Sequence, residues 1–145
     1  MYAHPDDYKK DSKPIEPTIF LYKPDARVRL FLRTSFQLTE TTFTAATFLV
    51  DTGCCSYLNI CEDLKKILRP RIKRADTGNY LETVVNGNKG FITLDSDLPD
   101  IANVIGLPMF FYLGISFNNQ RIGNFDYDED DIAYNVCKMA SFPYL

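Results

Sequence analysis

The chain has 145 residues, a hydrophobic content of 46% and a net charge of −3. This length predicts one domain with a substantial core, and the negative charge argues against nucleic acid as a partner. No apolar run approaches the roughly 18–20 residues of a membrane span, and the N-terminus lacks a signal-peptide pattern. We therefore expect a soluble protein of the cytoplasm or another intracellular compartment, or a domain of a longer polyprotein, with no membrane association.

Metal and nucleophile chemistry are disfavoured by the histidine and cysteine content. The single histidine, His4, lies in a polar N-terminal segment, and the four cysteines do not follow a zinc or redox spacing. A Ser–His or Cys–His nucleophile needs a histidine in the folded domain. We expect reduced cysteines, no metal and no cofactor.

The N-terminal third predicts strands. Residues 1–25 are expected to form a flexible or strand-forming arm, with an extended strand over 17–22. Apolar residues alternate with arginines over 27–33, which is typical of a half-buried strand. A polar turn is expected over 35–41, and the Thr-, Phe- and Val-rich segment 42–50 predicts the next strand.

The middle of the chain predicts a helix and a hairpin. Residues 62–68 begin with acids, end with bases and carry apolar residues at helical spacing, which indicates a short amphipathic helix. Residues 72–85 predict a β-hairpin with its turn at 76–79. A strand is expected over 90–94 and an acidic loop over 95–100. The basic run from Lys65 to Arg74 is interpreted as a solvated helix end and strand edge.

The C-terminal third predicts an apolar strand over 103–106, followed by a short helix that Pro108 opens. A closing hairpin is expected over 115–125. Residues 126–145 form an acidic extension in which the spacing of Ile132, Val136, Met139 and Ala140 predicts a helix.

Chemistry is concentrated in the stretch Phe48–Gly53 (FLVDTG). Three apolar residues of a predicted buried strand directly precede Asp51, and Gly53 permits a tight turn after it. A carboxylate held at such a strand end is expected in a largely apolar setting, which suits it to acid–base chemistry. The same letters recur at Asp76–Gly78, where no apolar strand precedes them.

These motifs together resemble the retropepsin-like aspartic proteases, which include retroviral and retrotransposon enzymes and their eukaryotic relatives. The resemblance covers roughly residues 26–125: a strand ending in Asp-Thr-Gly, a helix, a hairpin, and an apolar-apolar-Gly strand with a short helix. It implies a mainly β, closed single domain with one or two short helices, as one half-site protomer of a C2 dimer. The hairpin at 72–85 corresponds to the flap that closes over substrate.

Site roles follow from the resemblance. Asp51 corresponds to the catalytic residue, with Thr52 and Gly53 supporting its loop. The second family signature, whose apolar residues pass behind that loop, corresponds to Val104, Ile105 and Gly106. Cys54 stands where relatives commonly carry alanine. The substrate-binding candidates are Cys54 and Cys55 in the loop and Asp76, Thr77, Gly78 and Asn79 at the flap tip.

The implied function is that of a homodimeric aspartic endopeptidase acting on a polypeptide substrate. One usable Asp-Thr-Gly carboxylate per chain requires a twofold dimer, because the mechanism uses two carboxylates that share a proton. Two alternatives stay open: a retropepsin-like dimerisation or peptide-binding module with weak or no activity, and an unrelated β-protein with a chance Asp-Thr-Gly.

Overall fold

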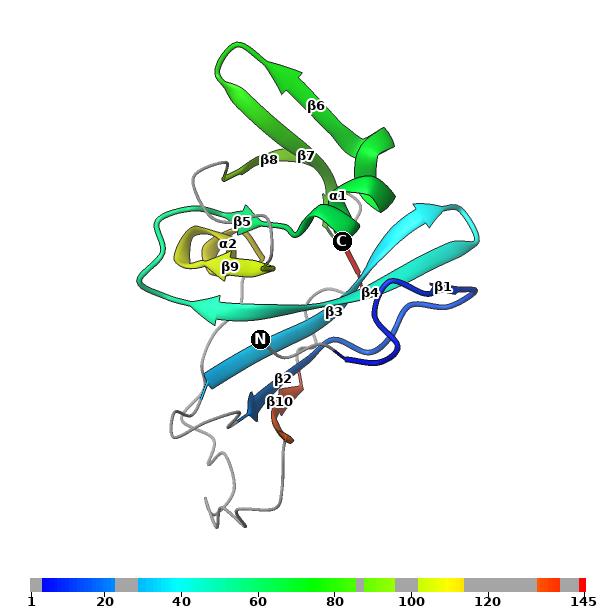
Figure 1. Cartoon of the computed structure of the whole chain (residues 1–145), viewed down its shortest axis with the longest axis vertical. Helices are drawn as coiled ribbons and strands as arrows, with labels where there is room; N and C mark the ends of the chain where they lie inside the picture. The colour runs from blue at the N-terminus through cyan, green and yellow to red at the C-terminus, as the bar shows by residue number, and fades with distance from the viewer. Residues whose placement is uncertain (1–3, 23–28, 86–87, 96–101, 114–132, 139–143) are drawn as a thin grey trace.

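The computed structural model describes residues 4–22, 29–85, 88–95, 102–113, 133–138 and 144–145 (Figure 1). The hairpin expected over 115–125, the acidic loop beyond Asp95 and the acidic cluster at 126–131 lie outside the described residues.

The described residues form mainly β-structure with two short α-helices. The strands are β1 (Lys10–Asp11), β2 (Thr18–Tyr22), β3 (Arg29–Thr39), β4 (Thr42–Asp51), β5 (Leu58–Asn59), β6 (Ile72–Ala75), β7 (Gly78–Val85), β8 (Asn88–Leu94), β9 (Val104–Gly106) and β10 (Ala133–Lys138). The helices are α1 (Glu62–Leu68), the 3-10 turn η1 (Arg69–Arg71) and α2 (Leu107–Leu113).

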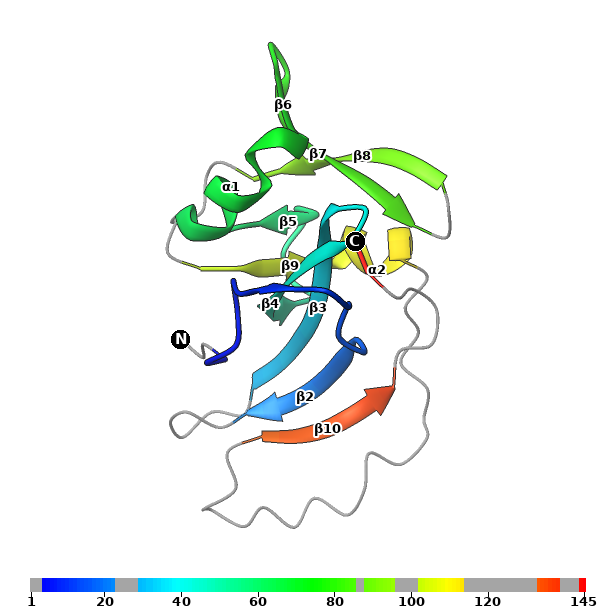
Figure 2. The ribbon, with the colours of Figure 1, turned by 90° about the vertical axis from the view of Figure 1, so that its right-hand side faces the viewer.

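These strands make one mixed sheet in the order β10-β2-β3-β4-β9-β5-β8-β7-β6, with β1 paired to β4. The β4–β9 and β5–β8 pairs are parallel, and the other pairs are antiparallel. Figure 2 shows β10 at one end of the molecule and the β6–β7 hairpin at the other. The expectation of a closed domain is therefore wrong for the described strands: β10 and β6 end the sheet far apart, and it stays open.

The strand β3 runs through the region expected to be a polar turn. Ser35 pairs with Ala45 of β4 and is buried, as are its neighbours Thr34 and Phe36. The turn is confined to Glu40 and Thr41. Pairing with β4 and burial of Phe36 override the polar composition, since β propensity depends on the surface that a residue packs against.

One apolar core joins the sheet to both helices. Leu64 and Leu68 of α1 and Met109 and Phe110 of α2 are buried in it. The predicted helix over 62–68 is thus confirmed at its predicted bounds, with acidic residues in its first turn and lysines in its last. The α-helix ends at Leu68, and the chain continues as η1, in which Arg69 keeps helical backbone and Pro70 lies in the first turn.

The hairpin predicted over 72–85 is confirmed. β6 and β7 pair from Ile72 with Leu81 out to Ala75 with Gly78, which leaves Asp76 and Thr77 as the turn. Gly78 has a φ of +135°, a value that L side chains rarely adopt, so the glycine is needed there.

Both terminal segments contribute strands to the domain. β2 confirms the extended strand expected over 17–22, and it pairs with β3 on one side and β10 on the other. The helix predicted in the C-terminal extension is wrong at 133–138, because the open edge of β2 offers backbone partners that favour a strand there. Beyond it, Leu145 is buried and exchanges two backbone hydrogen bonds of 2.8 Å with Ser35 and Gln37.

Candidate active site

Asp51 is the last residue of β4, and its carboxylate is exposed. Oδ1 accepts a hydrogen bond from the backbone N–H of Gly53 at 3.0 Å. The backbone N–H of Cys54 donates to the Asp51 carbonyl oxygen at 3.1 Å, which closes a turn after the strand. The first bond holds the side chain and the second holds the backbone, so the carboxylate has a defined direction.

The setting of this carboxylate differs from the expectation. Asp51, Thr52 and Gly53 are all exposed in the single chain, whereas the sequence predicted a largely apolar environment for Asp51. The strand leaves the core before its end, because Leu49 and Val50 are already half-buried. Burial of Asp51 therefore requires a group from outside the described chain.

The strand β9 lies between the strand that enters the Asp51 loop and the strand that leaves it. It pairs in parallel with β4, with Asp51 opposite Gly106, and antiparallel with β5. Two further backbone bonds tie it to the loop: Gly106 N–H donates to the Tyr57 carbonyl at 3.0 Å, and Leu107 N–H to the Cys54 carbonyl at 3.1 Å. The structure thus brings Val104, Ile105 and Gly106 together with Asp51, as the motif pair predicted.

Gly106 is required at this crossing by close backbone approach. A Cβ there would overlap the carbonyl oxygen of Ser56 and lie 2.9 Å from the carbonyl oxygen of Cys54. Both atoms belong to the backbone of the loop, so neither can rotate away. The loop and β9 therefore fit only with a hydrogen in place of a side chain.

Asn103 joins three segments directly before β9 and is buried. Its Nδ2 donates to the Tyr8 hydroxyl at 2.8 Å and to the Thr47 carbonyl at 3.2 Å, and its Oδ1 accepts from the Cys61 N–H at 2.8 Å. The sequence analysis placed Asn103 only at the start of an apolar strand and missed this role. The available signal was an amide next to a buried strand, since buried amides are normally hydrogen-bonded.

The N-terminal arm reaches the site through Tyr8. Its N–H donates to the Ala45 carbonyl at 2.9 Å, and its hydroxyl lies 3.2 Å from the Cys61 sulfur. A φ of +65° at Tyr8, uncommon for a residue with a Cβ, aims the ring inward. Burial, and then the neighbouring Cys61 thiol, raises the pKa of Tyr8 above its ordinary value. A salt bridge of 2.9 Å between Asp7 and Arg33 also holds the arm.

A second carboxylate, that of Asp95 directly after β8, supports the loop. The Ser56 hydroxyl donates to Asp95 Oδ2 at 2.8 Å, and the Asp95 N–H donates to the Leu58 carbonyl at 2.9 Å. From the sequence, Asp95 was expected only as the first residue of an acidic loop over 95–100. Its described contacts connect the end of β8 to the Asp51 loop and to β5, the strand that leaves this loop.

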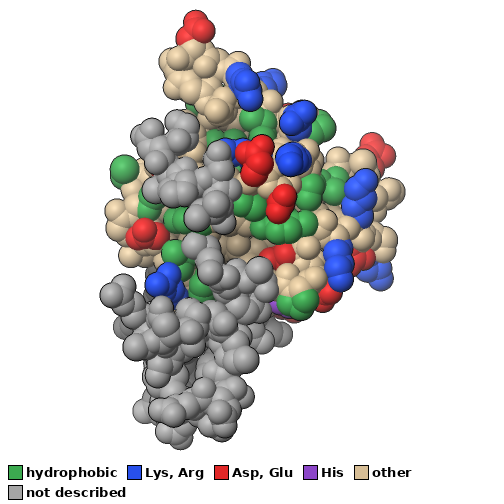
Figure 3. All heavy atoms as spheres, in the orientation of Figure 1, with side chains coloured by type: hydrophobic (Ala, Val, Ile, Leu, Met, Phe, Trp, Pro, Cys, Tyr) green, Lys and Arg blue, Asp and Glu red, His purple; other side chains and the backbone are tan. Residues whose placement is uncertain are grey.

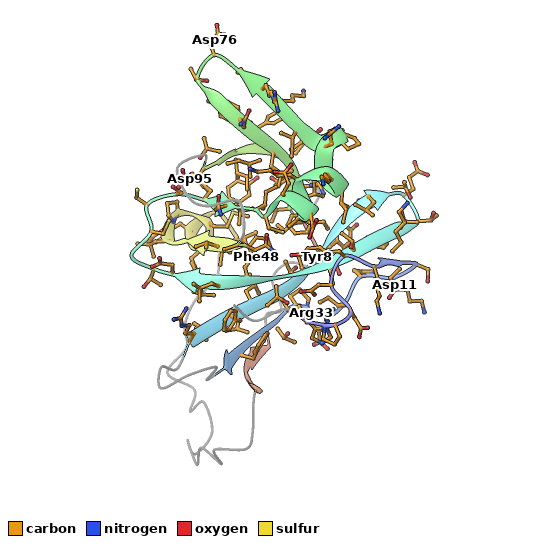
Figure 4. All side chains as sticks on the ribbon, viewed as in Figure 1. Tyr8, Asp11, Arg33, Phe48, Asp76 and Asp95 are labelled. Atoms are coloured by element: carbon orange, nitrogen blue, oxygen red, sulfur yellow. The ribbon has the colours of Figure 1, made fainter. Side chains whose placement is uncertain are left out.

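The two groups of substrate-binding candidates lie in different places. Cys54 and Cys55 follow Gly53 directly, and both are free thiols. The hairpin tip is separated from β4 in the sheet by β9, β5 and β8. Figure 4 shows Asp76 at the end of the hairpin, which projects from the rest of the described chain. Asp76, Thr77 and Gly78 are exposed there, and Asn79 is half-buried.

An apolar patch adjoins the Asp51 loop on α2. Leu107 and Phe111 lie one helical turn apart and are 40% and 79% exposed. Met109, Phe110 and Leu113 of α2 are buried, and Tyr112 is half-buried. The backbone bond from Leu107 to Cys54 fixes this patch beside the loop.

The comparisons with known proteins leave the family open. No family model matches the chain, and no curated protein or solved structure gives a significant match to it. Among the described residues, no helix combines the length and the apolar character needed to cross a bilayer. Among the described residues, no three His, Cys, Asp or Glu side chains gather in a metal-binding arrangement.

Proposed function

We propose that the protein is a retropepsin-like aspartic endopeptidase that works as a homodimer and hydrolyses peptide bonds in a polypeptide substrate. The observation that carries the proposal is the crossing of β9 between the two arms of the Asp51 loop. The crossing holds one exposed, directed carboxylate at the end of a buried strand.

The proposed chemistry uses Asp51 from each of two chains. One carboxylate, ionised, takes a proton from water as the water attacks the peptide carbonyl, while the other, protonated, gives its proton to the carbonyl oxygen. Two such groups within hydrogen-bond reach share a proton and titrate as a pair. Thr52 and Gly53 support the loop, and no metal or cofactor takes part.

The exposed surface around the loop supports a dimer. Thr52 and Gly53 lie open beside Asp51, and the apolar patch of Leu107 and Phe111 adjoins them. A twofold contact across this surface brings the two Asp51 residues together and removes Phe111 from water. The same twofold contact also buries Asp51, which is exposed in the single chain.

A peptide-binding module without strong activity is the second candidate. It is favoured by the position of the β6–β7 hairpin, whose tip projects away from the rest of the chain (Figure 4). A hairpin that stays in this position binds peptide without closing over Asp51, and fold alone does not establish catalysis.

The replacement Asp51→Asn tests the catalytic assignment, because an amide cannot hold the shared proton. We expect peptidase activity to fall by at least about a thousandfold, while the mass measured by light scattering stays that of a dimer. The matched control is Asp76→Asn in the second Asp-Thr-Gly, which is expected to alter substrate affinity at most.

Three results would contradict the proposal. Undiminished cleavage by Asp51→Asn would remove Asp51 from the reaction, and cleavage by a strict monomer would remove the dimer. A wild-type dimer that cleaves no peptide at acidic pH would favour the peptide-binding module.

A further inference from the structure

The basic run from Lys65 to Arg74 does not form one solvated face. Arg71 is half-buried and donates to backbone carbonyls, from Nη1 to Gln37 at 3.0 Å and from Nε to Glu82 at 3.1 Å. Lys73 lies over the ring of Phe91, with its Nζ 4.7 Å from the ring centroid. These two cations stabilise the hairpin and its attachment to the sheet.

Other cations of the run line a groove of about 630 Å³ between α1 and the hairpin. Lys65 and Arg69 come from the helical side, and Arg74 comes from β6. Arg69 and Arg74 are exposed, and their guanidinium groups have no hydrogen-bond or ionic partner among the described residues. Figure 3 shows the Lys and Arg side chains along β6 and over α1 and η1 on the face that it draws.

The alternation of side chains along β6 explains why Arg74 lines the groove and Lys73 does not. Successive side chains of a strand point to opposite faces, so Ile72 and Arg74 face the groove while Lys73 faces Phe91. Ile72 and Leu94 of β8 add apolar surface to the groove. The groove thus combines the unpaired guanidinium groups of Arg69 and Arg74 with an apolar lining.

The hairpin also offers a backbone edge beside these cations. β6 is the last strand in the sheet order, so its outer edge pairs with no other described strand. A peptide added along this edge places every second side chain on the face of Ile72 and Arg74. Acidic side chains at those positions reach Arg74 and Arg69.

The groove's carboxylates distinguish a peptide from a nucleic acid. Glu62 and Asp95 also line it, and the Asp95 carboxylate accepts the bond from Ser56. A continuous phosphate backbone has to pass these negative groups, in a chain whose net charge is −3. An extended peptide places separate carboxylates beside Arg69 and Arg74. Its uncharged residues then lie beside Glu62 and Asp95.

We propose that the groove between α1 and the β6–β7 hairpin binds an extended acidic peptide segment, with its carboxylates on Arg69 and Arg74 and its backbone along the edge of β6. This site is separate from Asp51 and does not need the proposed peptidase chemistry. It selects partners or substrates that carry an acidic segment.

Fluorescence anisotropy at low salt tests the proposal with a labelled peptide of about ten residues that alternates Glu and Val. The protein carries Asp51→Asn, which prevents cleavage and leaves the groove unchanged. Arg74→Gln and Arg69→Gln are each expected to weaken binding by about three- to tenfold, and raised salt to weaken it further. The matched control is Lys66→Gln, an exposed cation of α1 outside the groove, expected to change binding by less than about twofold.

A peptide with Gln in place of Glu and a single-stranded oligonucleotide serve as competing probes. Preference for the Glu peptide over both supports the proposal. Equal loss in Lys66→Gln and Arg74→Gln, equal binding of the Gln peptide, or tighter binding of the oligonucleotide would each overturn it. Because every measurement uses Asp51→Asn, absence of peptidase activity in the wild type does not affect the result.

Discussion

The chain contains Asp-Thr-Gly twice, and the two copies have different structures. Asp51–Gly53 ends β4, and its glycine N–H binds the carboxylate of its own aspartate. Asp76–Gly78 turns between β6 and β7, and its glycine begins a strand at a φ of +135°. The sequence Asp-Thr-Gly by itself therefore does not specify a backbone conformation. The two copies differ in their surroundings: β9 pairs with the strands on both sides of the first copy, and the second copy projects at an edge of the sheet.

The two regions also differ in how their backbone is held. The Asp51 loop is bound by β9, braced by Ser56 and Asp95, and tied to the arm through Asn103. At the hairpin tip, the described side-chain bond joins the exposed Thr77 hydroxyl to Tyr80. Changes in the loop region should accordingly cost much more folding free energy than matched changes in the hairpin.

The largest difference is expected between two glycine replacements. Gly106→Ala places a methyl group against the backbone of Ser56 and Cys54, and we expect a loss of at least about 3 kcal/mol in the free energy of unfolding. Gly78→Ala meets no atom within 4 Å and carries only backbone strain, with an expected cost of about 1–2 kcal/mol. Urea unfolding of both variants measures the difference, and equal losses would contradict a close-packed crossing at Gly106.

An intermediate effect is expected at Asn103. Asn103→Ala removes the hydrogen bonds to Tyr8, Cys61 and Thr47 and leaves backbone groups of the half-buried Cys61 and the buried Thr47 without them. We expect a loss of about 2–3 kcal/mol. The control is Asn88→Ala at the exposed start of β8, which should change stability by less than about 0.5 kcal/mol. A thermal melt in which the two variants coincide would show that the arm is not held through Asn103.

The smallest effect concerns alkaline pH. The pKa of Tyr8 is raised in the folded chain, so the unfolded chain loses this proton first as pH rises past its ordinary value of 10.0. The contribution of Tyr8 is complete below that pH and is lost as pH rises toward the folded pKa. Tyr8→Phe is therefore expected to make the decline of stability above pH 10 shallower.

The control for this pH dependence lies in the hairpin. Tyr80→Phe removes a phenol whose partner is the exposed Thr77 hydroxyl, and its alkaline decline is expected to match the wild type. Denaturant midpoints at pH 8 and at pH values above 10 give both slopes. A decline in Tyr8→Phe as steep as in the wild type would mean that the arm does not protect this hydroxyl.

The sequence predicted the local elements where the side-chain pattern matched a single structure. The helix over 62–68 and the hairpin over 72–85 have their predicted bounds, because apolar spacing, charge order and turn residues agree there. The passage of residues 104–106 behind the Asp51 loop was also expected, from the resemblance that two short motifs about fifty residues apart carry, and β9 lies there with Gly106 close to the loop backbone.

Tertiary contacts decided the remaining features. Ser35 and its neighbours read as a turn and became strand, since β4 supplies partners along their whole length. Residues 133–138 read as helix and became strand, since β2 has a free edge. Asn103, Asp95 and Tyr8 acquired their roles from residues 37 to 95 positions away, which no local pattern contains. Local patterns thus set the secondary structure only where apolar spacing, charge order and turn residues agree. Long-range pairing set the other strands and decided which edges meet and which polar groups are buried, because a hydrogen bond between distant segments exists only once the fold has brought them together.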